Sequence, residues 1–225
     1  MNIRGVVQVA GVGSLEEGRM LLECGVDLLG FPLRLPVHAP DTSEDQARAI
    51  IKALGPAVCV LITYEDDPDR LVDLCRFLNV DTVQLHAGVS PEILARIRAR
   101  LPLRIFKSYV VGRESVEPKR FAQDYAPVCD AFITDTFDAA TGASGATGLI
   151  HDWRVSAELV RCSPRPVILA GGLNPANVRQ AIRSVLPAAV DVHTGVEDSS
   201  GAKNPERVRA FVREARAGFA EVFGG

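Results

Sequence analysis

The sequence predicts a single (β/α)8 barrel of the TIM-barrel type that spans residues 1–225. Short apolar runs alternate with longer helical patterns eight times along the chain, and each run is rich in Val, Ile, Leu or Phe, as strands buried on both faces are. No Pro/Ser-rich linker or change of composition marks a domain boundary, so one α/β domain is expected. An open doubly wound sheet is the alternative, but GVGSLE after the first run lacks the third glycine of its fingerprint.

The expected strands consist mainly of Val, Ile, Leu and Phe. In chain order they are Val6–Ala10, Leu28–Phe31, Val58–Thr63, Thr82–His86, Arg104–Tyr109, Ala131–Asp135, Val167–Ala170 and Val190–Thr194. The helix after the first strand is expected to begin at the N-cap Ser14 and to end at Gly25. After the second strand, Ser43 is the expected N-cap of the next helix and Gly55 marks its expected end. The acidic run 65–67 favours the helix that follows the third strand, because negative charge stabilises a helix N-terminus.

The later helices show comparable start signals. The segment SPEILARIRARLP follows the fourth strand and has a helical pattern of apolar residues. Trp153 is expected to pack at the start of the helix after the sixth strand. Asn174-Pro175 begins the helix after the seventh strand, since proline is favoured in a first helical turn.

Composition excludes several classes of function. The net charge of −3 leaves no basic excess to neutralise phosphates, so no nucleic-acid partner is expected. No apolar run approaches the roughly 18 residues of a membrane helix, and no signal peptide is apparent, which indicates a cytoplasmic protein without membrane contact. The five cysteines are scattered and form no C-x-x-C pair, so free thiols are expected and neither a disulfide framework nor a metal site.

The carboxyl ends of the strands hold the polar residues, and that is the end where barrels of this type carry their chemistry. The relevant segments are QLH (84–86), TDT (134–136) and DVHTG (191–195). Side chains alternate between the two faces of a strand. By this alternation the residues expected to face the interior are Gln8, Ala10, Gln84, His86, Asp191 and His193. Buried polar groups cost free energy unless they are partnered, so these residues indicate a site or a polar layer.

Two glycine-containing loops indicate a phosphate site. Gly171, Gly172 and Leu173 follow the seventh strand, and Thr194 and Gly195 follow the eighth. Glycines let backbone N–H groups approach a ligand closely. The loops after these two strands form the usual phosphate site of such barrels, so these five residues are expected to bind phosphate.

Motifs along nearly the whole chain carry a resemblance to one enzyme family. They are ECGVDLLGF (23–31), DTVQLH (81–86), Asp135-Thr136, HDW (151–153), AGGLNPANV (170–178) and VDVHTGVE (190–197). Together they resemble the phosphoribosylanthranilate isomerases of tryptophan biosynthesis. These enzymes convert an N-linked phosphoribosyl amine into its amino-ketose and need no cofactor.

The resemblance implies a general acid and a general base. The acid protonates the furanose ring oxygen, and by the resemblance it is Asp135. The base, which removes the C2 proton of the ring-opened iminium, is a cysteine of the strand-one pattern K-[IV]-C-G. Here that pattern reads QVAG (8–11), so Ala10 stands where the base is expected. His86 and His193 both face the interior and are the candidates to replace it.

The segments expected around the non-phosphate half of the substrate also depart from the family pattern. After strand two the family carries S-P-R-Y, whose arginine is expected to hold the anthranilate carboxylate, whereas this chain reads FPLRLPVHAPDTSEDQ. Arg34 and His38 are the candidates to replace that arginine. The loop GASGATGLIHDW is longer than its family counterpart and lacks its lysine, and His193 stands where a serine is usual.

Four functions remain open at this point. The first is an isomerase of phosphoribosylanthranilate type with a different base. The second is a relative that acts on another phosphorylated substrate by isomerase, lyase or aldol-type chemistry, with Lys107, placed inward on strand five, as a potential Schiff-base residue. The third is a phosphate-ligand-binding protein without catalysis. The fourth is a metal-dependent epimerase that uses His86, Asp135, Asp191 and His193.

The isomerase is the preferred function, with a phosphorylated small molecule as substrate and a monomer or homodimer as its assembly. Asp135, His86 and His193 are the expected catalytic residues. The expected substrate-binding residues are Gln8, Arg34, His38, Gln84, Lys107 and Asp191.

Overall fold

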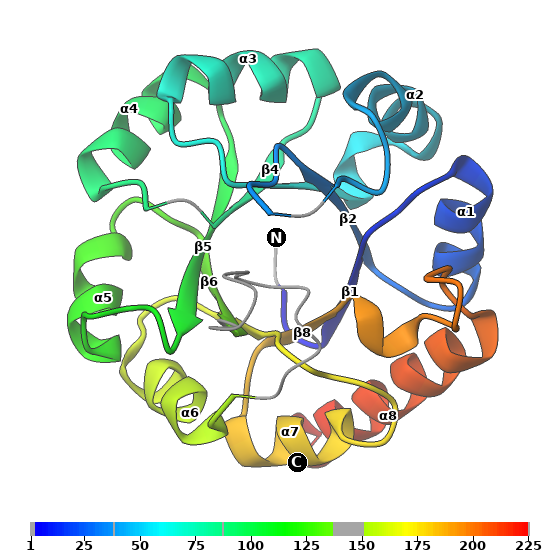
Figure 1. Cartoon of the computed structure of the whole chain (residues 1–225). Coiled ribbons are helices and arrows are strands. Elements are labelled where there is room, and N and C mark those ends of the chain that lie inside the picture. The colour runs from blue at the N-terminus through cyan, green and yellow to red at the C-terminus, as the bar shows by residue number, and fades with distance from the viewer. Residues whose placement is uncertain (1–2, 38, 87, 137–150, 225) are drawn as a thin grey trace.

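Eight parallel strands form a closed barrel (Figure 1). The structure is a computed structural model that describes residues 3–37, 39–86, 88–136 and 151–224. The strands pair in chain order, and β8 pairs with β1 to close the sheet. They are β1 (Val6–Ala10), β2 (Leu28–Leu33), β3 (Cys59–Thr63), β4 (Thr82–Leu85), β5 (Arg104–Val111), β6 (Ala131–Thr136), β7 (Val167–Leu169) and β8 (Ala189–Val192). The fold class expected from the sequence is therefore confirmed.

A helix follows each strand and lies on the outside of the barrel (Figure 1). The helices are α1 (Leu15–Glu23), α2 (Glu44–Leu54), α3 (Pro68–Leu78), α4 (Pro91–Arg100), α5 (Pro118–Tyr125), α6 (Trp153–Cys162), α7 (Val178–Val185) and α8 (Pro205–Phe223). Two short 3₁₀ turns, η1 (Pro56–Val58) and η2 (Thr194–Val196), precede β3 and follow β8. Within the described ranges, no helix is long and apolar enough to cross a membrane.

Three helices begin at the capping residues that the sequence predicts, but the start predicted for α7 at Asn174-Pro175 is wrong, because residues 175–177 form a turn and α7 begins at Val178. The Ser14 side chain accepts a hydrogen bond from the Glu17 N–H at the start of α1. Ser43 and Gln46 form a capping box on α2. Asp67 caps α3 by accepting from two backbone N–H groups. Each such cap contributes about 1 kcal/mol, because it satisfies N–H groups that have no partner within the helix.

Two apolar layers hold the barrel together. The outer layer lies between strands and helices and contains alternate strand residues such as Val7, Val9 and Leu29. The inner layer fills the barrel and includes Val6, Ala10, Leu28, Val60, Ile62, Phe106, Ile133, Ile168 and Ala189. Because consecutive strand residues point to opposite faces, this inner set fixes which polar residues also point inward.

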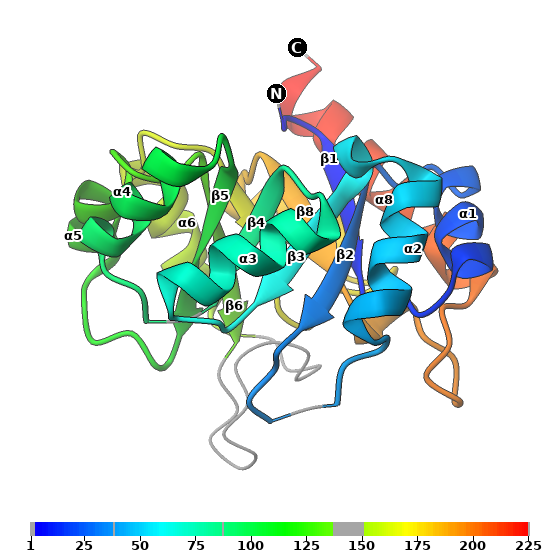
Figure 2. The ribbon, with the colours of Figure 1, turned by 90° about the horizontal axis from the view of Figure 1, so that it is seen from above.

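The polar residues expected to form the site lie at one end of the barrel, which is called its mouth below. The arrowheads of β2 and β6 mark the carboxyl ends of the strands, and the start of β1 and the end of α8 lie at the opposite end (Figure 2). Asp135 is the second-to-last residue of β6, and His193 is the first residue after β8. The strand direction therefore brings together side chains that lie far apart in the sequence.

Candidate functional site

A cavity of about 350 Å³ opens at the carboxyl ends of the strands. This volume is in the range of small-molecule sites. Most of the residues expected to form a site line it: Gln84, His86, Asp135, Gly171, Gly172, Leu173, Asp191, His193, Thr194 and Gly195. Ala10 lines it as well. The closed barrel therefore unites both predicted halves of the site, the acid–base residues and the glycine loops.

Asp135 is a buried carboxyl group at the end of β6, with an exposed fraction of 7%. Its Oδ1 accepts a hydrogen bond of 2.8 Å from the Thr136 N–H. Burial raises the pKa of Asp135 to about 7, and the charge of Asp191 adds to the increase, while the Thr136 N–H opposes it. A carboxyl group with a pKa raised in this way keeps its proton much closer to neutral pH than an exposed one and so can act as a general acid.

His86 faces Asp135 as a neutral imidazole. Burial lowers the pKa of His86 to about 3, and the charge of Lys107 contributes to the decrease. The 3.5 Å approach of His86 Nδ1 to Asp135 Oδ2 is therefore a contact of neutral imidazole with the carboxyl group and not an ion pair. Tyr64, at the exit of β3, packs its ring against the imidazole with centroids 5.1 Å apart.

A chain of amides determines which nitrogen of His86 carries the proton. Gln8 Nε2 donates to Gln84 Oε1 at 2.8 Å, which turns the Gln84 amide nitrogen toward His86 Nε2, also at 2.8 Å. His86 Nε2 is thus the acceptor, and the hydrogen of the neutral ring lies on Nδ1, toward Asp135. Gln8 does not line the cavity but orients His86 through Gln84.

Asp191 is the second buried acid of the site, one step before the end of β8. Burial raises its pKa to about 6, and the charges of His193 and Lys203 and the amide of Gln8 oppose this increase. Asp191 Oδ1 is a buried atom for which the described residues provide no hydrogen-bond donor. Because it lines the cavity, this atom is available to a donor on a ligand.

The two glycine loops interlock. A Cβ atom on Gly195 would lie 1.8 Å from the Leu173 carbonyl oxygen, so only glycine permits this approach. Gly171 and Gly172 have φ of 94° and 63°, the left-handed region that favours glycine. Asn177 Nδ2 donates to the Gly172 carbonyl at 2.9 Å and fixes the loop after β7. The sequence prediction missed this role of Asn177, although the residue is part of the AGGLNPANV motif.

The sequence prediction did not single out two further carboxylates that line the cavity, although one of them, Glu197, ends the VDVHTGVE motif. Asp41, in the loop before α2, and Glu197, after η2, line the cavity beside His193. Their carboxylates lie 3.7 and 3.4 Å from His193 Nε2. Burial opposes ionisation of Asp41, but its contact with His193 outweighs burial and lowers the pKa of Asp41. Residues 41 and 197 come from opposite parts of the sequence, so only the folded chain shows this cluster.

The orientation expected for Lys107 is wrong. Phe106 belongs to the inner layer, so Lys107 points outward from β5 toward α5. Its Nζ donates to the Ser108 carbonyl at 3.1 Å and lies 5.7 and 5.4 Å from the ring centroids of Phe121 and Tyr125. Burial lowers the pKa of Lys107 to about 8. The wall of the barrel separates this amine from the cavity.

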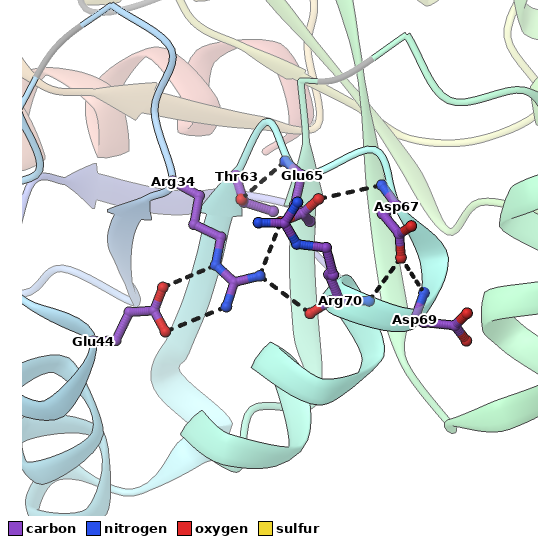
Figure 3. A network of polar contacts seen from close by, with 7 residues as sticks. All are labelled: Arg34, Glu44, Thr63, Glu65, Asp67, Asp69 and Arg70. Carbon is purple, nitrogen blue, oxygen red and sulfur yellow. Dashed lines mark hydrogen bonds and ion pairs between the residues drawn. The ribbon is translucent and has the colours of Figure 1, made fainter.

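Arg34 does not line the cavity either. Its guanidinium donates to Glu44 Oε1 at 2.8 Å and to Glu65 Oε2 at 2.9 Å (Figure 3). It thus connects the start of α2 with the loop after β3, and both carboxylates hold it there. His38, the other candidate to bind a substrate carboxylate, lies outside the described residues, as do residues 137–150, which contain most of the segment GASGATGLIHDW. In the described ranges, no group of three or more metal-ligating side chains is present.

Comparisons with known proteins agree with this geometry. A family model described as N-(5'phosphoribosyl)anthranilate (PRA) isomerase matches residues 23–214. The chain is 35% identical over 220 residues to N-(5'-phosphoribosyl)anthranilate isomerase 2 of Methanosarcina mazei, and the match covers 96% of both chains. It is similar to the structure of phosphoribosyl anthranilate isomerase from Thermotoga maritima, with 30% identity, a TM-score of 0.78 and coverage of 94% and 98%. A structure of such an isomerase in complex with reduced 1-(o-carboxyphenylamino)-1-deoxyribulose 5-phosphate has 28% identity, a TM-score of 0.76 and the same coverage.

Proposed function

The chain belongs to the phosphoribosylanthranilate isomerase family, and from this premise we propose that it isomerises N-(5'-phosphoribosyl)anthranilate to the amino-ketose of tryptophan biosynthesis. The observation that carries the proposal is the Asp135 carboxyl group, whose pKa of about 7 suits a general acid. It shares one cavity with two interlocked glycine loops that suit a phosphate group. We further propose a cytoplasmic enzyme that acts as a monomer or homodimer.

Ring opening is the step assigned to Asp135. Its proton passes to the furanose oxygen while the bond between C1 and that oxygen breaks and its electrons go to the oxygen. The lone pair of the substrate nitrogen forms the C=N bond of the iminium. His86 Nδ1 lies 3.5 Å from Oδ2 of the acid, and the Gln8–Gln84 chain holds the tautomer with its hydrogen on Nδ1. Asp191 Oδ1 accepts a hydrogen bond from a ribose hydroxyl in this proposal, which satisfies a buried acceptor.

The direct test is turnover of N-(5'-phosphoribosyl)anthranilate by the purified protein, followed by the loss of substrate fluorescence. Growth of a tryptophan auxotroph that lacks this isomerase is the parallel test in cells. The proposal requires both turnover and growth. A folded protein that binds the product analogue but shows neither would instead support a non-catalytic phosphate-binding protein.

The activity is expected to fall as the pH rises through about 7, because only the protonated form of Asp135 donates a proton and its pKa is about 7. Above that pH, kcat/KM is expected to decrease about tenfold per pH unit. A profile measured from pH 5 to 9 checks this. A rate that stays constant between pH 7 and 9 would show that another group donates the proton.

The wall opposite the glycine loops is mostly apolar. It contains Pro32, Leu35, Pro36, Val37, Ala39 and Ile62, with Asp41 and Glu197 at its edge. Among the described lining residues none is Lys or Arg, and the sequence of residues 137–150 contains neither. Arg113 follows β5, and its charge opposes the raised pKa of Tyr64 in this wall.

The carboxylate of the substrate is therefore expected to contribute little to kcat/KM. A charge-assisted pair with arginine contributes about 1.5–3 kcal/mol, or roughly 10–150-fold. We expect kcat/KM for N-(5-phosphoribosyl)aniline, which lacks the carboxylate, to lie within about tenfold of the anthranilate value. Steady-state kinetics with both compounds measure the ratio. A preference above about 100-fold would contradict this expectation, and Arg113→Ala would then show whether Arg113 binds the carboxylate.

The Schiff-base version of the lyase or aldol alternative loses its candidate residue, because Lys107 points away from the cavity. Other chemistry on a different phosphorylated substrate stays an alternative. The apolar wall favours an uncharged or aromatic substituent on such a substrate.

A further inference from the structure

The proposed reaction needs a base at C2, and strand one provides none, because Ala10 stands where the family has its cysteine. None of the five cysteines lines the cavity. Cys24, Cys59, Cys75 and Cys129 are buried, and Cys162 is half-buried on α6. Burial raises the pKa of Cys59, Cys75 and Cys129 to about 12, so these thiols are protonated at neutral pH. The base must therefore be a different kind of group.

The strand register places a histidine beside the vacated position. β1 and β8 pair with Gln8 opposite Asp191 and Val9 opposite Val192. One residue further along, Ala10 ends β1 and His193 directly follows β8, at the carboxyl ends of the strands where the cavity opens. Both line it. Two departures from the family pattern therefore lie at the same cavity. Alanine replaces the strand-one cysteine, and histidine replaces the usual serine.

The imidazole of His193 covers the carboxyl end of β1. A Cβ atom on Gly11 would lie 2.2 Å from His193 Nε2 and 2.8 Å from Cδ2, so the ring packs against the Gly11 backbone. The His193 side chain is 19% exposed, which leaves part of the ring accessible from the cavity. The His193 ring therefore lies on the same side of the cavity as position 10, where the family has its cysteine.

Carboxylates orient the ring. Glu197 Oε1 lies 3.4 Å and Asp41 Oδ1 3.7 Å from His193 Nε2. Lys203 Nζ holds Glu197 Oε1 at 2.5 Å and the His193 carbonyl at 3.3 Å, so Glu197 and His193 are fixed relative to each other. Negative charge at Nε2 favours the tautomer with its hydrogen there, which leaves the lone pair on Nδ1. This is the arrangement of a histidine base supported by a carboxylate.

We propose that His193 is the general base of this enzyme in place of the strand-one cysteine, an inference that rests on the proposed isomerase function. After Asp135 has opened the ring, a nitrogen of His193 takes the C2 proton of the iminium. The electrons of the C2–H bond form the C1=C2 bond, and the C=N electrons return to nitrogen. The resulting enolamine becomes the amino-ketose when its C2 hydroxyl loses a proton and C1 gains one, so the reaction is a balanced isomerisation.

The other two inward groups suit this role less well. His86 Nε2 accepts from Gln84, so the ring hydrogen lies on Nδ1, 3.5 Å from Asp135 Oδ2, and the neutral ring has no free lone pair to take a proton. Asp191 lies one layer deeper than Ala10, beside Gln8. His193 is the titratable group at the level of the missing thiol.

The test compares His193→Asn, His193→Ala, Ala10→Cys and the double variant Ala10→Cys/His193→Ala, with N-(5'-phosphoribosyl)anthranilate as substrate. Removing a general base costs on the order of 10²–10⁴-fold in kcat. We expect that loss in both single His193 variants, with KM changed by less than about threefold. Free imidazole is expected to restore part of the His193→Ala rate, and the double variant to exceed His193→Ala by at least about tenfold.

A substrate deuterated at C2 gives a readout that a purely structural role of His193 would not change. The kinetic isotope effect on kcat is expected to be larger in His193→Asn than in the wild type, because C2–H cleavage then limits the rate. Circular dichroism establishes that the variants are folded.

The possible failures are distinguishable. Wild-type activity that His193→Asn retains within about threefold would overturn this inference alone. An inert wild type with an active Ala10→Cys variant would overturn both the inference and the proposed function, and would show that the pocket is intact and lacks only its base. If neither the wild type nor Ala10→Cys turned over the substrate, the proposed function and the inference would both be overturned.

Discussion

Asp135→Asn is expected to lower kcat on the order of 10²–10⁴-fold and, at pH 8, to make the protein more stable. The loss of activity follows because asparagine cannot donate a proton to the ring oxygen. The amide oxygen still accepts the hydrogen bond from the Thr136 N–H, so the local backbone keeps its partner. A loss of activity combined with a gain of stability excludes misfolding as its cause.

The direction of the stability change follows from proton linkage. The pKa of Asp135 is raised from 3.8 to about 7 by burial, so between these values the folded protein binds more protons than the unfolded chain. The free energy of unfolding therefore decreases as the pH rises from about 4 to about 7, and above pH 7 the buried charge destabilises the fold in full. Removing that charge is expected to raise stability at pH 8 by about 1–3 kcal/mol.

Urea unfolding of wild type and Asp135→Asn at pH 5 and pH 8 measures this difference. The stability gain is expected to be larger at pH 8 than at pH 5. The exposed Asp73→Asn on α3 is the matched control, since its side chain is 75% exposed, and no change of activity is expected from it. An Asp135→Asn variant that keeps activity within tenfold of wild type would contradict the assignment of the acid.

Gly195→Ala is expected to raise KM by at least about 100-fold, because it separates the two loops of the phosphate site. The added Cβ would lie 1.8 Å from the Leu173 carbonyl oxygen and 2.9 Å from its carbonyl carbon. Both atoms are backbone, so the loops after β7 and β8 must move apart. Overpacking of this kind also costs about 1–3 kcal/mol of stability.

Gly88→Ala is the matched control for this prediction. Gly88 follows β4 at the same end of the barrel, and a Cβ there would meet nothing within 4 Å. Steady-state kinetics and competition with inorganic phosphate are expected to be unchanged in Gly88→Ala. If Gly195→Ala bound substrate and phosphate as the wild type does, the glycine loops would not be the phosphate site.

The sequence determined the architecture because its signals are local. β1 has the predicted bounds, and the other strands deviate by one or two residues at their ends. Ser14 and Ser43 cap helices as expected, since a capping side chain bonds to N–H groups two or three residues away. The motif residues at the carboxyl ends of β4, β6 and β8 were also identified, because in a parallel barrel all these ends lie on one side.

The orientation of Lys107 on β5 could not be predicted from the local sequence. The strand RIFKSYVV carries apolar residues on both of its faces, so the pattern does not show which face turns inward. A shift of one residue would reverse every side chain. Only the inner position of Phe106 decides that Lys107 points outward. Arg34 is a similar case, since its partners Glu44 and Glu65 come from two different elements.

The sequence by itself thus determined that the chain forms a barrel with Asp135, Asp191 and two glycine loops at the carboxyl ends of its strands. Only the tertiary structure decided that His86 is neutral with its hydrogen toward Asp135 and that the His193 ring packs against Gly11, the residue after Ala10. The physical reason is that these properties depend on closure of the sheet between β8 and β1 and on burial by residues distant in the chain. Strand register and desolvation exist only once the barrel has closed.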